Sequence, residues 1–231
     1  MTIKKLGRRE AIGVMGAAGA ALAFGCGGSP TSPDTASSTT TTTGSTNAAC
    51  AVTPTETAGP FPSLTDLFRS DIREGRTGTL LTLTVKVVNV NTSCAPVANA
   101  NVEVWHCDSA GNYSQYGSQT AQTYLRGIQT TNANGEVTFT TIYPGWYQGR
   151  ATHIHLEVTT NGVSRKVTQI AFPESVNATV YRAGVYASKG TNPTANAADG
   201  IFADSLASEL VTPTGDVANG FVANCQVAVA L

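Results

Sequence analysis

Two of the chain's three histidines, His153 and His155, lie one residue apart in the stretch PGWYQGRATHIHLEV, residues 144–158. The run around them has the composition of a β-strand, in which side chains at positions i and i+2 point to the same face. Two imidazoles side by side on one face can supply half of a metal site. The alternative is a pair of surface or core histidines, but such alternation is uncommon by chance in a histidine-poor chain, so we favour metal binding.

Tyrosines are the nearest candidates for the remaining ligands. Tyrosinate is a hard anionic oxygen donor, and together with imidazole it suits a hard, highly charged cation such as Fe(III) better than zinc or Cu(I). A phenol with a pKa of about 10 ionises at neutral pH only where such a cation stabilises the anion. The candidates are two residues close to the histidines and two farther upstream, Tyr143, Tyr147, Tyr113 and Tyr116.

Short β-prone runs must position these residues. Residues 79–90 and 100–106 alternate apolar and polar side chains, as half-buried strands do. Asn134-Gly135 and Asn161-Gly162 each separate two β-prone runs and predict two hairpins. Short turns of helix are expected within residues 63–72 and 199–210, and long loops within 176–214. The fold class is therefore mainly β, an antiparallel β-sandwich with long loops and little helix.

The N-terminal residues 1–26 predict an export signal. A cationic head containing Arg8-Arg9 precedes a mildly apolar stretch too short for a membrane-spanning helix, which is typical of a twin-arginine signal. Cys26 resembles a lipoprotein cleavage site; the alternative is an ordinary signal whose cysteine is incidental. Lipidation of Cys26 would anchor the protein to a membrane. Either way we expect an exported protein of the periplasm or cell envelope.

Residues 27–49 are rich in Ser, Thr, Gly and Pro and predict a disordered linker, so the folded domain is expected at residues 50–231. The full chain has 14 basic and 15 acidic residues, a net charge of -1. Removing residues 1–26 takes away four basic residues and one acid, which leaves 10 against 14 and a charge of -4. That balance argues against nucleic acid as a partner.

The four cysteines beyond Cys26 suggest two disulfides, because their number is even and the chain is expected to be exported. Four cysteines allow three pairings. We favour Cys50–Cys225, which would tie the termini together, and Cys94–Cys107. None of the four has C-x-x-C spacing, so a zinc site or a thioredoxin-type site is not expected.

Three segments of the chain together resemble one enzyme family. They are VEVWHCDSAGNYSQYG, then TYLRGIQTTNANGEVTFTTIYPGWYQGRATHIHLEV, then TQIAF, and the upstream TPTETAGPFP resembles the family's entry motif. Their order and spacing are similar to those of the intradiol ring-cleavage dioxygenases, which include catechol and protocatechuate 3,4-dioxygenases. The resemblance covers residues 50 to about 172 and implies an exported bacterial member of the family.

The resemblance implies a non-haem Fe(III) cofactor held by two tyrosines and two histidines. By motif position, Tyr113 and His153 would be equatorial ligands, whereas His155 and Tyr147 would be axial. Tyr147 would leave the metal when substrate binds. Arg150, three residues before the first histidine, would steady negative charge that develops on the substrate. Gln169 of TQIAF matches a further active-site position.

The implied reaction consumes O2 and cleaves the ring of a catechol-type diol between its two hydroxylated carbons, giving a muconate-type diacid. One alternative is a non-catalytic envelope module of the same fold that binds aromatic ligands. Another is an exported zinc hydrolase that uses His106 with the two other histidines, although it lacks an obvious carboxylate base. We otherwise expect His106 and Arg126 to be structural. The physiological catechol and the oligomeric state, monomer or homo-oligomer, stay open.

Overall fold

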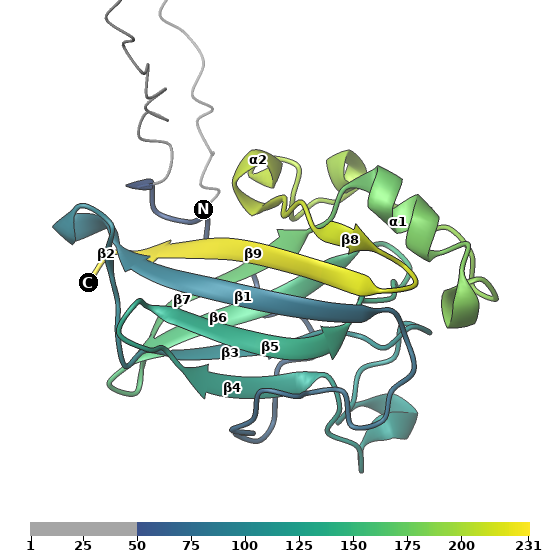
Figure 1. Cartoon of the computed structure of the whole chain (residues 1–231), viewed down its shortest axis with the longest axis horizontal. Coiled ribbons are helices and arrows are strands. Elements are labelled where there is room, and N and C mark those ends of the chain that lie inside the picture. The colour runs from purple at the N-terminus through teal and green to yellow at the C-terminus, as the bar shows by residue number, and fades with distance from the viewer. Residues whose placement is uncertain (1–49) are drawn as a thin grey trace, which may run out of the picture. The chain divides into compact units, whose positions relative to one another are not determined.

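The computed structural model describes residues 50–231, which form a two-sheet sandwich with few helices (Figure 1). The strands are β1 Leu80–Asn89, β2 Ala95–Pro96, β3 Asn101–Trp105, β4 Arg126–Thr130, β5 Glu136–Ile142, β6 His153–Thr160, β7 Val163–Ala171, β8 Thr214–Asp216 and β9 Gly220–Val229. The helices are α1 Glu174–Val180 and α2 Leu206–Glu209. The predicted mainly β sandwich is thus confirmed. The predicted signal, lipidation site Cys26 and linker lie outside the described residues.

The first sheet is built around β1, the long strand predicted by the alternating pattern. It pairs antiparallel with β2 and β5 on one side and parallel with β9 on the other, and β8 extends the sheet beyond β9. The second sheet has the order β4-β3-β6-β7, with antiparallel pairs throughout. The parallel pairing of β1 with β9 joins segments about 140 residues apart in the chain, and no local pattern predicts it.

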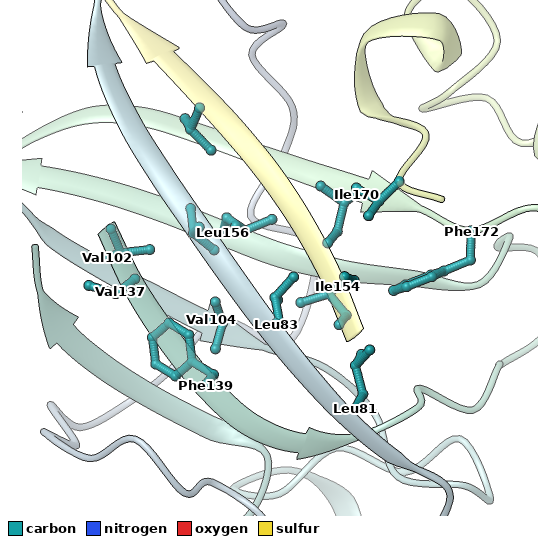
Figure 2. Packing of buried hydrophobic residues seen from close by; sticks show 14 of the residues in the cluster. Leu81, Leu83, Val102, Val104, Val137, Phe139, Ile154, Leu156, Ile170 and Phe172 are labelled. Atoms are coloured by element: carbon teal, nitrogen blue, oxygen red, sulfur yellow. The ribbon is translucent and has the colours of Figure 1, made fainter. Parts of the chain in front are cut away.

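The core fills the space between the two sheets. Alternate residues of each strand face inward because successive side chains of a strand point to opposite faces. Figure 2 shows apolar side chains from β1, β3, β5, β6 and β7 meeting there, among them Leu83, Val104, Phe139, Ile154 and Ile170. Burying each such side chain stabilises the fold by about 1.5–3 kcal/mol. Because Ile154 faces this core, its neighbours in β6 must face outward.

The two Asn-Gly turns behave differently. Asn161 and Gly162 have φ angles of 50° and 72° and join the antiparallel pair β6–β7, which confirms the predicted hairpin. Asn134-Gly135 also forms a turn, in which the Asn132 side chain accepts hydrogen bonds from the backbone N–H groups of Asn134 and Glu136. The strands on either side of it pair in different sheets, β4 with β3 and β5 with β1. The predicted hairpin is therefore wrong there, and the turn carries the chain from one sheet to the other.

Of the two segments predicted to contain helix, one does and the other does not. Residues 199–210 contain α2, as predicted, but residues 63–72 form no helix. Their backbone instead pairs with the edges of two strands: Arg69 N–H donates to Ile128 of β4, and Ser70 C=O accepts from Thr140 of β5. These pairings satisfy the groups that a helix would have bonded internally. Within residues 50–231, no helix is both long and apolar enough to cross a membrane.

The disulfide pairing differs from the one we favoured. Cys50 bonds Cys94, with a Cα–Cα distance of 5.5 Å, while Cys107 and Cys225 are free thiols. Cys225 packs against the core from β9, and Cys107 lies in a separate apolar cluster with Trp105. Neither sulfur can therefore reach the predicted partner. The bridge ties the start of the domain to the chain just beyond β1.

We predict that replacing Cys94 with serine will lower the free energy of unfolding by about 2–4 kcal/mol, because the bridge closes a loop of 44 residues. Urea unfolding of wild-type and variant protein would measure the loss. Alkylation of the unfolded, unreduced protein should label Cys107 and Cys225 and spare the other two. A label on Cys50 or Cys94 would contradict the pairing.

Candidate metal centre

One cross-strand row places four chemically active side chains on the outer face of the second sheet. Arg126 of β4 lies opposite Trp105 of β3, which lies opposite His155 of β6, which lies opposite Gln169 of β7. Residues directly opposite each other in adjacent strands project to the same face. Because Ile154 points into the core, this row and His153 point away from it. All five side chains are buried, so other segments must cover them.

Two histidines and two tyrosines converge at one point on this face. His155 Nε2 lies 3.1 Å from His153 Nε2. The hydroxyl oxygens of Tyr113 and Tyr147 lie 3.3 Å and 3.5 Å from His153 Nε2. Tyr113 comes from the loop after β3 and Tyr147 from the loop before β6, so three separate segments supply the four side chains. The structure thus brings together all four residues predicted as metal ligands.

The spacing of these donor atoms fits a single metal ion. Neighbouring donors that each lie about 2.0–2.1 Å from one cation, at angles of about 90–120°, are roughly 2.8–3.6 Å apart. The observed separations from His153 Nε2, 3.1–3.5 Å, match that spacing. Among the described residues, no cluster of three or more His, Cys, Asp or Glu side chains exists that could hold a metal without phenols. The donor set therefore combines imidazole and phenol, which favours a hard cation such as Fe(III).

Both histidines are neutral, as metal binding requires, and the tautomer of His153 is fixed by a hydrogen bond. His153 Nδ1–H donates to the carbonyl of Ala151 at 2.6 Å, which leaves the lone pair on Nε2 facing the other donors. Burial, with a contribution from the charge of Arg150, lowers the pKa of His153 to about 3. Burial and the neighbouring His153 likewise lower the pKa of His155. Both rings are consequently neutral donors at physiological pH.

The two phenols must each lose a proton to bind a metal as an anion, and burial opposes that loss. Burial raises the pKa of Tyr113 well above its ordinary value, and burial also raises the pKa of Tyr147, although the Arg150 guanidinium opposes that rise through its charge and a hydrogen bond. Without a cation both side chains are protonated at neutral pH. A metal ion at the convergence point would reverse this preference, because it stabilises the phenolates directly.

A segment from the N-terminal part of the domain covers the site. The Phe61 ring stacks on Tyr113, with ring centroids 4.7 Å apart. Gly59 has a φ of +70°, and a methyl group on it would lie 3.1 Å from His155 Cε1. The Trp105 ring also stacks on His155 in parallel, with a centroid separation of 4.9 Å. His155 thus packs against both a backbone segment and an aromatic ring.

Arg126 organises the loop that carries Tyr113. Its guanidinium donates to the Ser114 hydroxyl and carbonyl at 2.9 Å and 2.8 Å, and to the Phe61 carbonyl at 3.0 Å. Ser114 follows Tyr113 in the chain, and Phe61 stacks on the Tyr113 ring. The prediction that Arg126 is structural is confirmed, and its contacts fix the ring of a candidate ligand.

Arg150 and Gln169 lie together beside the donors. The Arg150 Nη2 group donates to Gln169 Oε1 at 2.5 Å, and Gln169 Nε2 donates to the carbonyl of Thr57 at 2.8 Å. Arg150 also bonds Asp199, a buried carboxylate that the sequence analysis did not single out. Asp199 lies in a segment without regular spacing, so no sequence pattern pointed to it.

The other two candidate tyrosines and the third histidine form hydrogen bonds to groups other than the four converging side chains. Tyr143 Oη donates to Asn177 Oδ1, and Tyr116 Oη donates to the Pro62 carbonyl. His106 is buried, with Nδ1 bonded to the Cys107 carbonyl and Nε2 to the Thr141 hydroxyl. Both of its ring nitrogens are occupied, which argues against a zinc site built on three histidines. The structural role predicted for His106 is confirmed.

We predict that lowering the pH will destabilise the protein partly through His106. Burial lowers its pKa from 6.5 to about 4. As the pH falls from 6.5 towards 4, the unfolded chain binds a proton that the folded protein does not. The free energy of unfolding therefore decreases by up to about 1.4 kcal/mol per pH unit for this residue. Urea unfolding of wild-type and His106→Asn protein between pH 7 and 4.5 should give a shallower pH dependence for the variant; equal slopes would contradict the prediction.

Comparisons with known proteins agree on one family. The family model Dioxygenase_C, described as "Dioxygenase", matches residues 58–181, which contain all four converging side chains. Catechol 1,2-dioxygenase 2 of Acinetobacter lwoffii is 34% identical over 93 residues, 32% of this chain and 34% of that protein. Chlorocatechol 1,2-dioxygenase of Rhodococcus opacus is 28% identical over 102 residues, 36% of this chain and 40% of that protein. The matched part thus spans well under half the length of these curated relatives.

A solved structure gives broader coverage. The intradiol ring-cleavage dioxygenase from Tetranychus urticae is 30% identical with a TM-score of 0.71, covering 78% of this chain and 95% of that one. The likeness therefore includes both sheets and the segments that cover the site. From the family match, the shared fold and this structural relative, the chain belongs to the intradiol ring-cleavage dioxygenase family.

Proposed function

We propose that the protein is a non-haem Fe(III) dioxygenase that uses O2 to cleave catechol-type diols between the two hydroxylated carbons, giving muconate-type diacids. The observation that carries the proposal is the convergence of Tyr113, Tyr147 and His155 within 3.1–3.5 Å of His153 Nε2. Family membership supports the same reaction class, because two relatives bear the names catechol and chlorocatechol 1,2-dioxygenase.

The four donors would hold the iron, and each contributes differently. His153 and His155 would supply neutral lone pairs. The buried Tyr113 would supply a phenolate, because the cation reverses the effect of burial on its pKa. Bound there, Fe(III) supplies a Lewis acid and an electron acceptor that make a catecholate reactive towards O2. Tyr113, the more buried of the two phenols, would be the one that continues to hold the metal when the substrate binds.

Tyr147 would handle a proton during substrate binding. Its oxygen is less buried than that of Tyr113 and lies near the Arg150 guanidinium. We propose that Tyr147 Oη takes the proton of one catechol hydroxyl and remains protonated, since burial favours the neutral phenol. Arg150, held by Gln169, then presents fixed positive charge where the substrate becomes anionic. The aromatic cover from Phe61 limits access of water to this face.

Spectroscopy and oxygen uptake test the proposal together. Ferric phenolate absorbs visible light, so the iron-loaded protein should be red-brown. Adding catechol, protocatechuate and hydroxyquinol separately should produce oxygen uptake with at least one, together with the ultraviolet spectrum of a muconate-type product. A colourless protein that takes up no iron, or a coloured protein inert towards all three diols, would contradict the proposal. The same comparison identifies the preferred ring substituent. A non-catalytic ligand-binding module is not favoured, because such a domain has no need of four convergent donors.

We also propose that the protein is exported and that Arg8-Arg9 directs this export. The Cys50–Cys94 disulfide supports an oxidising compartment, since such bonds are rare in cytosolic proteins. Replacing both arginines with lysine should retain the protein in the cytoplasm, as fractionation would measure. Replacing Cys26 with serine in the same assay, followed by detergent partitioning, tests lipid anchoring.

A further inference from the structure

Asp199 is a carboxylate with no exposed surface that contacts Arg150 at Nε, whereas Gln169 contacts Nη2. Its Oδ2 atom accepts hydrogen bonds from Arg150 Nε at 2.9 Å and from the backbone N–H of Ala151 at 2.6 Å. Its Oδ1 atom accepts from the backbone N–H of Ile201 at 2.8 Å. Every contact made by this carboxylate is therefore with a donor, and two of the donors belong to consecutive residues at the entrance to β6.

The Ala151 peptide connects Asp199 to a candidate ligand. The N–H of Ala151 is bonded to Asp199, and the carbonyl of Ala151 accepts the Nδ1–H of His153. Asp199 thus constrains the short segment from which both Arg150 and His153 project. The chain enters β6 directly after this segment.

Arg150 is in turn fixed from two directions. Asp199 holds Nε, and Gln169 holds Nη2. The guanidinium also lies over the Phe202 ring at 5.7 Å, in the same segment that carries Asp199. Gln169 lies opposite His155 in the adjacent strand, so these contacts place the guanidinium beside the candidate ligands.

We propose that Asp199 is a positioning residue that holds the Arg150 guanidinium beside the candidate ligands, and so orients the positive charge that the ring-cleavage reaction uses. The inference rests on the proposed function, and it concerns a residue that no motif of the family resemblance contains. A carboxylate suits this place because both of its oxygens accept. An amide would present its NH2 group to an N–H donor whichever way it was turned.

The test compares Asp199→Asn with Asp204→Asn in the full, iron-loaded protein. Asp204 is an exposed carboxylate five residues further along, outside the contacts described above, so its variant serves as a matched control. We expect Asp199→Asn to lower kcat by about 10-fold to 100-fold, because a misdirected group loses its effect in the transition state. The KM for catechol should change by less than about 3-fold. The visible charge-transfer band should shift to longer wavelength as the positive charge of Arg150 moves away from the Tyr147 phenolate.

A double-mutant cycle separates positioning from general damage to the fold. If Asp199 acts through Arg150, adding Asp199→Asn to an Arg150→Gln protein should change kcat by less than about 2-fold. Arg150→Lys keeps the positive charge, but a lysine ammonium cannot bond Asp199 and Gln169 together as the planar guanidinium does. This variant should therefore show the same loss of kcat. It provides a second measurement if Asp199→Asn folds poorly. An equal loss from Asp199→Asn in both backgrounds would overturn the inference, as would an unchanged kcat and band.

Measurements on the wild-type protein separate a failure of the positioning role of Asp199 from a failure of the proposed dioxygenase function. A wild-type protein with a charge-transfer band and catechol cleavage, combined with an Asp199→Asn protein identical to it, contradicts the positioning role alone. A wild-type protein with neither property contradicts the proposed function and the positioning role together.

Discussion

Replacing His153 with alanine should abolish iron retention and reduce ring cleavage by more than about 10³-fold. His153 Nε2 is the atom that His155 and both tyrosines approach within 3.5 Å, so its loss removes the centre of the donor set. The remaining phenols would then be protonated, because burial raises the pKa of both. Metal analysis of the purified variant and oxygen uptake with catechol measure the two effects.

The matched control for this experiment is His106→Asn. His106 is equally buried, but its ring is bonded to Thr141 and to the Cys107 carbonyl rather than to the site. We expect this variant to retain iron and colour. If His153→Ala kept the metal, the assignment of the site would be wrong. If both variants lost the metal, a zinc-type triad of histidines would regain support.

Replacing Tyr113 with phenylalanine should leave a protein that binds iron more weakly, about 10-fold to 100-fold, and whose visible absorption is markedly reduced. The substitution removes a single oxygen, and the ring can keep its stacking on Phe61. Only the phenolate is lost, so the remaining absorption comes from Tyr147. Titration of the metal-free protein with ferric iron, followed at visible wavelengths, measures both affinity and intensity.

Tyr116→Phe is the corresponding control. Its hydroxyl donates to the Pro62 carbonyl, and its ring meets Phe61 edge-on at 5.3 Å. This variant should keep the spectrum of the wild-type protein. An undiminished absorption in Tyr113→Phe would show that Tyr113 is no ligand, and a loss in Tyr116→Phe instead would move that role to the neighbouring tyrosine.

The histidine pair was predictable because it depends on the period of a strand alone. Alternation at His153 and His155 placed both rings on one face, and Ile154 on the core side, before any tertiary contact was known. Tyr113 and Tyr147 were different. Their side chains reach the site from loops, and only the resemblance to a family distinguished them from Tyr116 and Tyr143.

Features that depend on the meeting of distant segments were not predictable. Asn134-Gly135 and Asn161-Gly162 carry the same turn signal, yet only the second joins strands of one sheet, because the partners of β4 and β5 lie elsewhere in the chain. The disulfide depends likewise on which chain segment passes beside Cys94. Asp199 has neither periodicity nor a motif, and its importance follows from being buried against Arg150.

The Cys50–Cys94 bridge has a mechanical consequence for the segment that covers the metal centre. That segment is held to the sandwich by hydrogen bonds such as Thr53 N–H to Ala228 and Glu56 N–H to Val167. Any tension on the chain ahead of Cys50 passes first into the sulfur–sulfur bond and from there into the end of β1, which pairs with β2 on one side and β9 on the other. The weaker bonds around Gly59 and Phe61 bear little of that load, so the candidate metal centre is shielded from force applied ahead of Cys50.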